Sequence, residues 1–377
     1  MTGKKFFKLS LIVIICSIIL ISGIVYGTDP FFHYRAPSKS FFYRIYDQRS
    51  QNDGITRFFD YDSIITGTSM AENFRTSLFD ELMGTKSVKL PYSGATYKEL
   101  NDNLKVSYKS GHELKYVLRP LDYSQLVMDK DILREDMGEY PTWLTNNNPF
   151  DDVKYLLNRD VLINYTFPMI AKFFLGKEGG YTDFDDYSYT GDSNSYSKAA
   201  ALSFLQGSSS FPEADIVYGP SDEDAKKVTG NVVQNVVSLA KEHPETTFLY
   251  FFPPYSMAYW GSLKSEGTLD QMLAYKKIAI DQMLECDNIH IYSFSLFTDI
   301  TENLDNYRDV AHYSPKINEW IMVKIAECEH SAGIDNAFTS DNAVNEQYGR
   351  ITKENASEYL RLEKELLDNY EYNSLLE

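Results

Sequence analysis

Three residues of this 377-residue sequence have types and spacing suited to nucleophilic catalysis: Ser69, Asp309 and His312. Asp309 and His312 are three apart in NYRDVAHYSP, so one turn can bring the carboxylate to the imidazole and orient it. A serine, a histidine and an orienting carboxylate are the parts of an acyl-transfer triad. Each motif also fits a structural alternative, because a serine or threonine can cap a helix and His312 can be an ordinary capping residue.

The segment 61–74, YDSIITGTSMAENF, indicates how Ser69 would be positioned. A short apolar strand stops at Gly67 and turns into a helix that begins near Met70. Such a turn presents Ser69 at the carboxyl edge of a parallel sheet, where ligands bind in open α/β folds. The backbone N–H of a serine at a helix N-terminus is also suited to holding an oxyanion.

Further apolar runs alternate with helical patterns along the chain. Together with the strand before Ser69, they predict an α/β fold with a parallel, flavodoxin-like sheet of five strands. The loop 253–256 after the fourth strand would lie at the catalytic edge and line a pocket. The other predicted strands are 87–94, 114–118, 246–252 and 288–294, and the main helices are 96–109, 231–242, 269–284 and 315–328.

The order of an early Ser and a late Asp-x-x-His, just before the last core helix, resembles the SGNH/GDSL hydrolase superfamily. GTS at 67–69 stands where that family has GDS or GSS, and DVAH at 309–312 stands for its DxxH. The resemblance covers about 61–328, with one long interruption. It implies that Ser69 is the nucleophile, that His312 is the base and that Asp309 orients the imidazole.

The same resemblance implies an oxyanion hole made by the N–H groups of Ser69 and Gly94. A turn glycine with positive φ is the alternative for Gly94. The family's third block usually ends in Gly-x-Asn-Asp, whose Asn completes the hole, whereas this chain has RPLDY at 119–123. Asp122 is the nearest counterpart, and an ionised aspartate cannot donate a hydrogen bond.

The N-terminus carries Lys4, Lys5 and Lys8, followed by an uncharged apolar run at 9–27. Nineteen helical residues span about 28 Å, close to the ~30 Å core of a bilayer. We therefore expect a cytoplasmic tail at 1–8, a transmembrane anchor at 9–27 and a membrane-proximal connector at 28–60, with the following domain extracytoplasmic. A signal peptide and a buried core helix are the alternatives.

The α/β pattern is interrupted between about 127 and 230. This large, mostly helical insertion, with helices near 150–159 and 161–174, is expected to form a cap beside the site. Its segment 179–196 is predicted to be a loop, in which Asp183, Asp185 and Asp186 are more easily read as solvated side chains than as Ca²⁺ ligands. After the domain at 61–330, the tail 331–377 is expected to be peripheral and acidic, with one helix at 356–370.

Composition excludes some classes of function. The formal charge of −18 argues against a nucleic-acid partner, because phosphates require a basic face. No metal and no cofactor are predicted, since no Cys/His cluster or zinc motif is present. Cys286 and Cys328 either form a disulfide or remain as two buried free thiols.

The resemblance extends to membrane-anchored proteins that acylate cell-envelope polymers. The chain looks like the D-alanyl transfer protein of teichoic-acid D-alanylation and like proteins that O-acetylate exported polysaccharides. The partners implied are the membrane, a surface polysaccharide or teichoic-acid acceptor and a membrane-bound O-acyltransferase. An esterase acting on surface glycans, and a catalytically silent scaffold or glycan-binding protein, are the alternatives.

Overall fold

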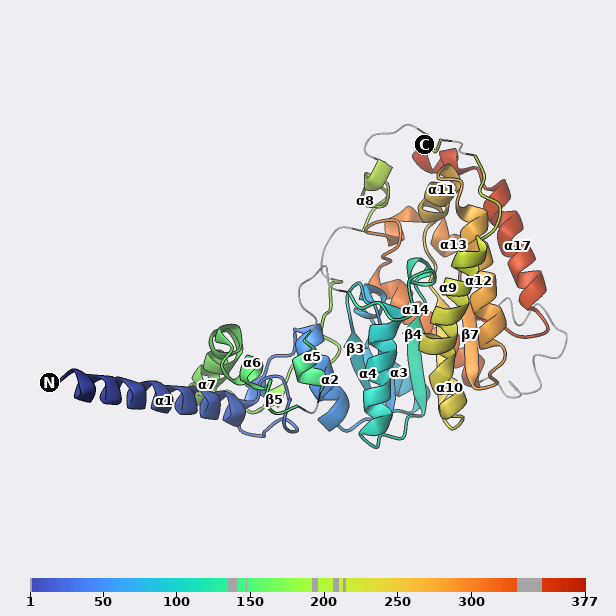
Figure 1. The fold of residues 1–377 in the computed structure, drawn as a ribbon. Coiled ribbons are helices and arrows are strands. Elements are labelled where there is room, and N and C mark those ends of the chain that lie inside the picture. The colour runs from blue at the N-terminus through green and yellow to red at the C-terminus, as the bar shows by residue number, and fades with distance from the viewer. Residues whose placement is uncertain are drawn as a thin grey trace. The chain divides into compact units, whose positions relative to one another are not determined.

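The computed structural model divides the chain into two compact units (Figure 1). The N-terminal unit comprises Met1–Asp60, Lys109–Gly111 and Glu135–Tyr187, and the sheet unit comprises Tyr61–Tyr108, His112–Arg134 and Ser188–Glu377. The predicted insertion is thus shared between the two units. The structure describes residues 2–134, 141–146, 148–191, 196–205, 210–212, 215–330 and 348–377.

The sheet unit is built on a six-stranded, mostly parallel sheet in the order β3-β2-β4-β6-β7-β8. Five strands are parallel, and β8 joins the edge antiparallel to β7. The prediction of five strands therefore missed one. The strands are β2 (Ser63–Gly67), β3 (Ser87–Pro91), β4 (Tyr116–Pro120), β6 (Thr247–Phe252), β7 (Ile289–Ser293) and β8 (Arg350–Ile351).

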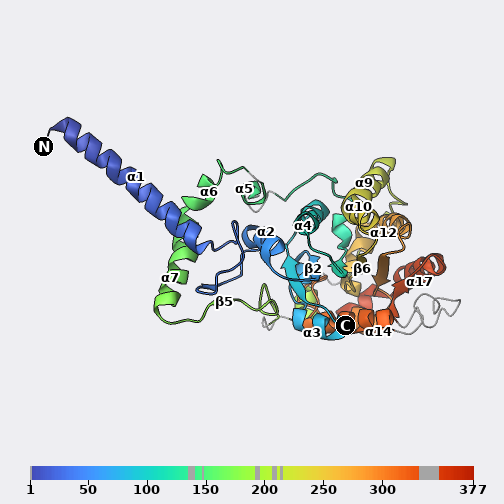
Figure 2. The same cartoon turned by 90° about the horizontal axis from the view of Figure 1, so that it is seen from below.

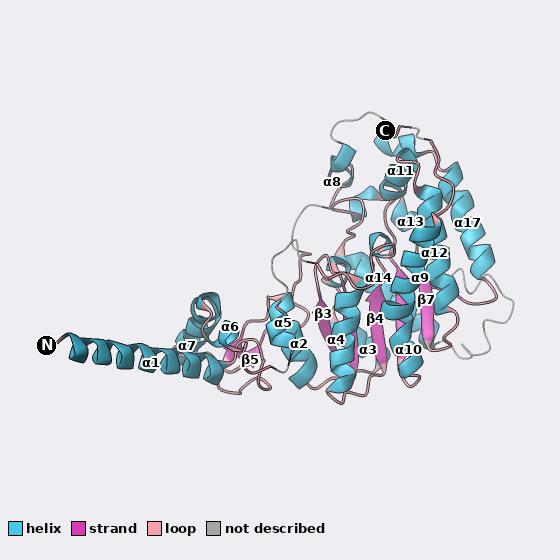
Figure 3. Cartoon of the chain, viewed as in Figure 1, coloured by secondary structure: helices cyan, strands magenta, loops and turns pink. Residues whose placement is uncertain are grey.

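Helices cover both faces of this sheet, which is why its strands are buried along nearly their whole length (Figures 2 and 3). In Figure 2, α3 and α14 lie on one face, and α4, α9, α10 and α12 lie on the other. The longer helices are α3 (Thr76–Met83), α4 (Tyr97–Lys109), α9 (Asp222–Val232), α10 (Ser238–Glu242), α11 (Met257–Ser265), α12 (Leu269–Met283), α14 (Pro315–His330) and α17 (Ala356–Asn369). Short turns add η1 (Ser69–Ala71), η2 (Tyr123–Gln125), α8 (Lys198–Ala201), η4 (Ser203–Leu205), α13 (Thr298–Thr301), η6 (Leu304–Asn306) and η7 (Tyr372–Leu376).

The helix predicted at 231–242 begins nine residues earlier than expected. Ser221 caps α9 by accepting a hydrogen bond from the N–H of Asp224, and acidic residues fill the first turn, where the helix dipole favours them. A π-helical segment, η5 (Val233–Val237), joins α9 to α10. The first half of the helix is polar, so a search for apolar periodicity could not detect where the helix begins.

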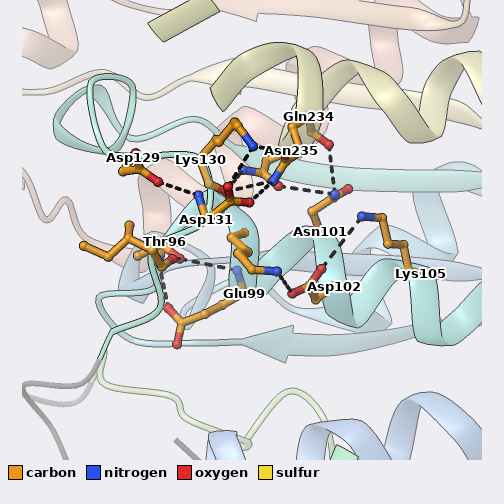
Figure 4. Close-up of polar contacts among 12 residues, drawn as sticks. Thr96, Glu99, Asn101, Asp102, Lys105, Asp129, Lys130, Asp131, Gln234 and Asn235 are labelled. Atoms are coloured by element: carbon orange, nitrogen blue, oxygen red, sulfur yellow. Dashed lines mark hydrogen bonds and ion pairs between the residues drawn. The ribbon is translucent and has the colours of Figure 1, made fainter. Parts of the chain in front are cut away.

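Hydrogen bonds connect the loop that follows β4 to η5 and to the start of α4 (Figure 4). Asn235 donates to the carbonyl of Lys130 at 2.8 Å, and Gln234 donates to Oδ1 of Asp131 at 2.8 Å. The hydroxyl of Thr96, which also caps α4, donates to the carbonyl of Ile132 at 2.8 Å. These contacts fix the loop on its way to Arg134.

The expectation of a peripheral C-terminal tail is wrong for the part that the structure describes. Residues 350–351 form β8, and the next helix, α17, places Glu363 in the core with no exposed surface. Its carboxylate pairs at 2.5 Å with Nζ of Lys276 on α12, which is also fully buried. Residues 331–347 lie outside the described part of the chain.

The N-terminal unit begins with α1 (Gly3–Thr28), a helix whose length and hydropathy suffice to cross a membrane. Its other elements are β1 (Phe42–Tyr43), α2 (Gln48–Phe58), α5 (Thr142–Thr145), α6 (Val153–Leu156), η3 (Val161–Thr166), α7 (Phe167–Phe174) and β5 (Gly180–Tyr181). The helix expected at 150–159 is thus reduced to four residues. The expected loop at 179–196 starts with β5, which pairs with β1, and residues 192–195 lie outside the described part.

The connector expected at 28–60 contains a helix, α2, that the sequence analysis did not predict. Asp47 caps it by accepting from the N–H of Ser50 at 3.1 Å. The helix buries polar side chains, so an apolar pattern could not reveal it. Gln51, for example, donates to the carbonyls of Pro30 and Arg44, both at 3.0 Å. It thereby joins α2 to the two loop segments that precede it.

Candidate active site

Ser69, His312 and Asp309 form a continuous hydrogen-bonded chain in the sheet unit. Oγ of Ser69 lies 2.7 Å from Nε2 of His312, and Nδ1 of His312 lies 2.7 Å from Oδ2 of Asp309. The other carboxylate oxygen, Oδ1, accepts from the backbone N–H groups of Ala311 at 2.9 Å and His312 at 2.8 Å. The three residues predicted from spacing are therefore brought together in the order that a triad requires.

The turn after β2 presents Ser69. The strand ends at Gly67, and η1 begins at Ser69. Thr68 caps this turn, because its Oγ1 accepts from the N–H of Met70 at 3.3 Å. Gly67 has a φ of +155°, and a Cβ there would lie 2.8 Å from the ring of Pro120, so the tight turn requires glycine. Ser69 itself is half-buried, which leaves its hydroxyl within reach of a substrate.

The turn that carries Asp309 and His312 is held from two sides. Tyr307 and Tyr313 form an antiparallel bridge across its base. At its tip, the carbonyl of Val310 accepts from the N–H and the hydroxyl of Ser256, at 3.1 and 2.8 Å. The loop 253–256, expected to line a pocket, thus holds the turn of Asp309 and His312 in place.

The electrostatics of Asp309 suit an orienting carboxylate. Burial raises the pKa of Asp309, but the hydrogen bonds from His312 and from the N–H of Ala311 outweigh this and lower the pKa to about 2. The side chain remains about 45% exposed, and that of His312 about 29%. Asp309 is therefore ionised at neutral pH.

Gly94 lies three residues after β3, at the same edge of the sheet as Ser69. Its φ of +64° is in the left-handed region, as the turn-glycine interpretation expected. The guanidinium of Arg134 lies over it, 1.1 Å from where a Cβ would stand, and a larger residue would have to displace that side chain as well as adopt the left-handed φ. Among the described residues, the backbone N–H groups of Ser69 and Gly94 have no protein acceptor.

Asp122 lies close to the triad, but both of its carboxylate oxygens are occupied by hydroxyl groups of the protein. Its Oδ2 accepts from the hydroxyl of Thr68 at 2.8 Å, and its Oδ1 accepts from the hydroxyl of Tyr255 at 2.7 Å. Burial raises its pKa, although the hydrogen bonds from Tyr255 and Thr68 partly oppose this. Asp122 therefore joins the loops that follow the adjacent strands β2, β4 and β6, and it positions the turn of Ser69.

Sequence reasoning missed a second group of residues at the site. Oδ1 of Asn73 accepts from the N–H and the hydroxyl of Thr190, at 2.9 and 3.2 Å. The same hydroxyl accepts from the guanidinium of Arg308 at 3.2 Å. Thr190 thus connects the end of the Ser69 turn to the start of the Asp309 turn. The three segments are far apart in sequence and share no motif, so only the structure could reveal the connection.

The other candidate sites are occupied by local interactions. In the predicted loop, Oδ1 of Asp183 accepts from the N–H of Asp185 at 2.8 Å and so stabilises the loop's own turn. Within the described ranges, no group of three or more His, Cys, Asp or Glu could hold a metal ion. Cys286 and Cys328 are buried free thiols, which decides between the two alternatives for them.

Comparisons of the chain with family models, with curated proteins and with solved structures gave no significant match. The assignment of the site therefore depends on its own geometry.

Proposed function

We propose that the protein is a membrane-anchored serine acyltransferase or esterase that acts on acyl groups of cell-envelope polymers. The observation that carries this proposal is the chain of two 2.7 Å hydrogen bonds from Ser69 through His312 to Asp309. A serine hydroxyl on an imidazole that is itself held by a carboxylate is the arrangement that activates serine as a nucleophile.

In the first half-reaction, Oγ of Ser69 attacks the carbonyl carbon of an ester or thioester. His312 takes the hydroxyl proton at Nε2 and returns it to the leaving alcohol or thiol as the carbon–heteroatom bond breaks. In the second half-reaction, a hydroxyl group or water gives its proton to His312 and attacks the acyl carbon. The bond to Oγ then breaks, and Ser69 regains its proton.

The N–H groups of Ser69 and Gly94 are the proposed donors to the oxyanion, since both are at the carboxyl edge and neither has a described acceptor. Asp122 does not supply a third donor, because both of its oxygens are bound to hydroxyl groups. Loss of one donor costs ~10²–10³-fold in rate in a well-studied hydrolase. We therefore expect slow hydrolysis of simple esters.

The resemblance to SGNH-type envelope proteins, the mostly parallel sheet with helices on both faces and the apolar α1 support the remaining parts of the proposal. α1 would anchor the chain, with the sheet unit on the extracytoplasmic side. The acceptor would be a hydroxyl of a surface polysaccharide or teichoic acid, and the acyl donor would come from a membrane-bound O-acyltransferase.

Labelling with a fluorophosphonate tests the proposal. The full-length protein should be labelled at Ser69, and Ser69→Ala should abolish the label while circular dichroism stays unchanged. Ser77→Ala, which removes an exposed serine of α3, is the matched control and should label normally. Labelling that persists in Ser69→Ala would refute the nucleophile.

A second assay separates the alternatives. An esterase should release acetate from a model ester, whereas a transferase should release it slowly and accelerate when a polymer acceptor is added. A scaffold or glycan-binding protein should do neither and should not react with the fluorophosphonate.

A further inference from the structure

The segment formed by η3 and α7 exposes an apolar face. Ile163, Phe167, Ala171 and Phe174 are three or four residues apart, so they lie on one side of the helix, and all are exposed. Phe174 is 80% exposed, and the adjacent Leu175 is 85% exposed. We call these five residues the apolar face of α7.

The opposite side of the same segment is buried in the N-terminal unit, through Val161, Thr166 and Met169. A helix on the surface of a soluble unit normally presents polar residues outward, whereas this one is apolar on both sides. Residues 161–177 contain two lysines and no acidic residue. This composition suits a segment that contacts apolar surroundings and has anionic groups nearby.

The end of α1 fixes the position of this segment. Val25, near the end of α1, shares a buried cluster with Val161 and Tyr155. The hydroxyl of Thr28, the last residue of α1, reaches that of Thr166 at 3.5 Å. In Figures 1 and 2, α7 runs across this end of α1 and does not continue its direction. A bilayer crossed by α1 would therefore have its surface beside α7.

We infer that the apolar face of α7 lies in the interfacial layer of the membrane leaflet at which α1 ends. From 9 to 27 α1 carries no charged residue and is largely exposed, so a bilayer that α1 crosses would also reach the apolar face of α7 beside its end. Lys172 and Lys177, whose Nζ atoms lie 5.2 and 4.5 Å from the centre of the Phe42 ring, would meet anionic headgroups. The inference rests on the proposed anchor, and it does not depend on the chemistry of Ser69.

Site-directed spin labelling of the full-length protein in pure lipid vesicles tests this. The vesicles contain phosphatidylcholine and phosphatidylglycerol at 3:1. Cys16 is exposed on α1, and Cys286 and Cys328 are buried, so the native chain is labelled at Cys16 and reports on the anchor. Phe174→Cys and Leu175→Cys are labelled in a Cys16→Ser background. Tyr218→Cys, an 80% exposed aromatic position of the sheet unit, is the control.

Labels at 174 and 175 should collide more with molecular oxygen than with a water-soluble nickel complex, whereas the label at 218 should show the reverse. Since no other kind of protein is present, preferential collision with oxygen at 174 and 175 reports contact with lipid. If the Cys16 label is lipid-accessible but 174 and 175 behave like 218, the inference is overturned while the anchor stands. If the Cys16 label is also in water, both the anchor and the inference fail.

Discussion

The two oxygens of Asp309 do different things. Oδ1 is bound by two backbone N–H groups, which fix the carboxylate, and Oδ2 holds Nδ1 of His312. The carboxylate thereby selects the tautomer with a proton on Nδ1 and leaves Nε2 free to accept the proton of Ser69. The hydrogen bond at 2.7 Å between Ser69 and Nε2 has the direction needed for this transfer only in that tautomer.

Asp309→Asn should slow fluorophosphonate labelling of Ser69 strongly. The amide can keep the contacts of Oδ1, but it offers an N–H to Nδ1 and so favours the wrong tautomer. The equivalent change in a serine protease costs ~10⁴-fold. Asp305→Asn, in the same loop but bonded to the N–H of Lys198 at 2.9 Å, should label at the normal rate. Equal rates for the two variants would contradict the role of Asp309.

Asp122→Asn should change how stability depends on pH. Because burial raises the pKa of Asp122, its favourable contribution is complete below the unfolded pKa of about 3.9 and is lost as pH rises through the folded pKa. Asparagine does not titrate. The free energy of unfolding of the variant, relative to that of the unmodified protein, should therefore increase from pH 4 to pH 8.

Urea unfolding in detergent micelles measures this difference. Asp131→Asn is the control, because its exposed carboxyl has a pKa that the hydrogen bond from Lys130 lowers. The stabilising contribution of ionised Asp131 is already present above the unfolded pKa. The free energy of unfolding of Asp131→Asn, relative to that of the unmodified protein, should therefore stay constant over the same pH range. A flat curve for Asp122→Asn would show that Asp122 does not titrate in this way.

At the scale of elements, the pair Lys276 and Glu363 connects α17 to the sheet. Nζ of Lys276 also donates to the hydroxyl of Ser293 at 2.7 Å, and that of Ser295 contacts Glu363. Burial lowers the pKa of Lys276, and the carboxylate of Glu363 opposes this. The charge on Lys276 is thus kept in the core by its partner on the last long helix.

Glu363→Gln should destabilise the protein by about 3–5 kcal/mol, because it leaves a buried ammonium group without a counter-charge. Glu365→Gln, on the same helix but in an exposed pair with Arg361, should cost less than about 1 kcal/mol. Chemical denaturation of both variants measures the two effects. A Glu363→Gln variant as stable as Glu365→Gln would show that Lys276 is neutral in the core.

The elements that sequence predicted well are those with a continuous apolar pattern. The four later parallel strands and the helices α4, α12 and α14 lie close to their predicted ranges. α2 and the first half of α9 were missed because capping residues and buried polar side chains define these helices, and they lack an apolar periodicity. β8 was missed because a two-residue edge strand has no periodicity and is defined only by β7 beside it.

At the scale of the whole molecule, the triad and the apolar helix belong to different units. All three triad residues lie in the sheet unit, and α1 lies in the N-terminal unit. The triad could be predicted because its members sit in short motifs with recognisable order. The parts of the site contributed by Thr68, Tyr255 and Thr190 could not, since contacts between distant loops leave no local signal.

Replacement of Ile15 and Ile19 by arginine should release the full-length chain from the alkali-resistant membrane fraction. Both side chains are exposed on α1, and each arginine near the centre of a bilayer costs about 2.5–3.5 kcal/mol of insertion free energy. The matched variant with leucine at both positions should stay in the membrane fraction. Retention of the arginine variant would argue against a transmembrane α1.

The antiparallel β8 has a consequence for how the chain is made. Every triad residue precedes position 313, yet the described strand that pairs with the edge of β7 and the carboxylate that pairs with Lys276 come from residues 349–377. During synthesis, which proceeds from the N-terminus, the nascent sheet therefore holds all three residues of the proposed triad beside an open strand edge. A premature stop codon near position 345 would leave that intermediate as the final product. Such a chain would retain Ser69, Asp309 and His312 and still be lost to aggregation.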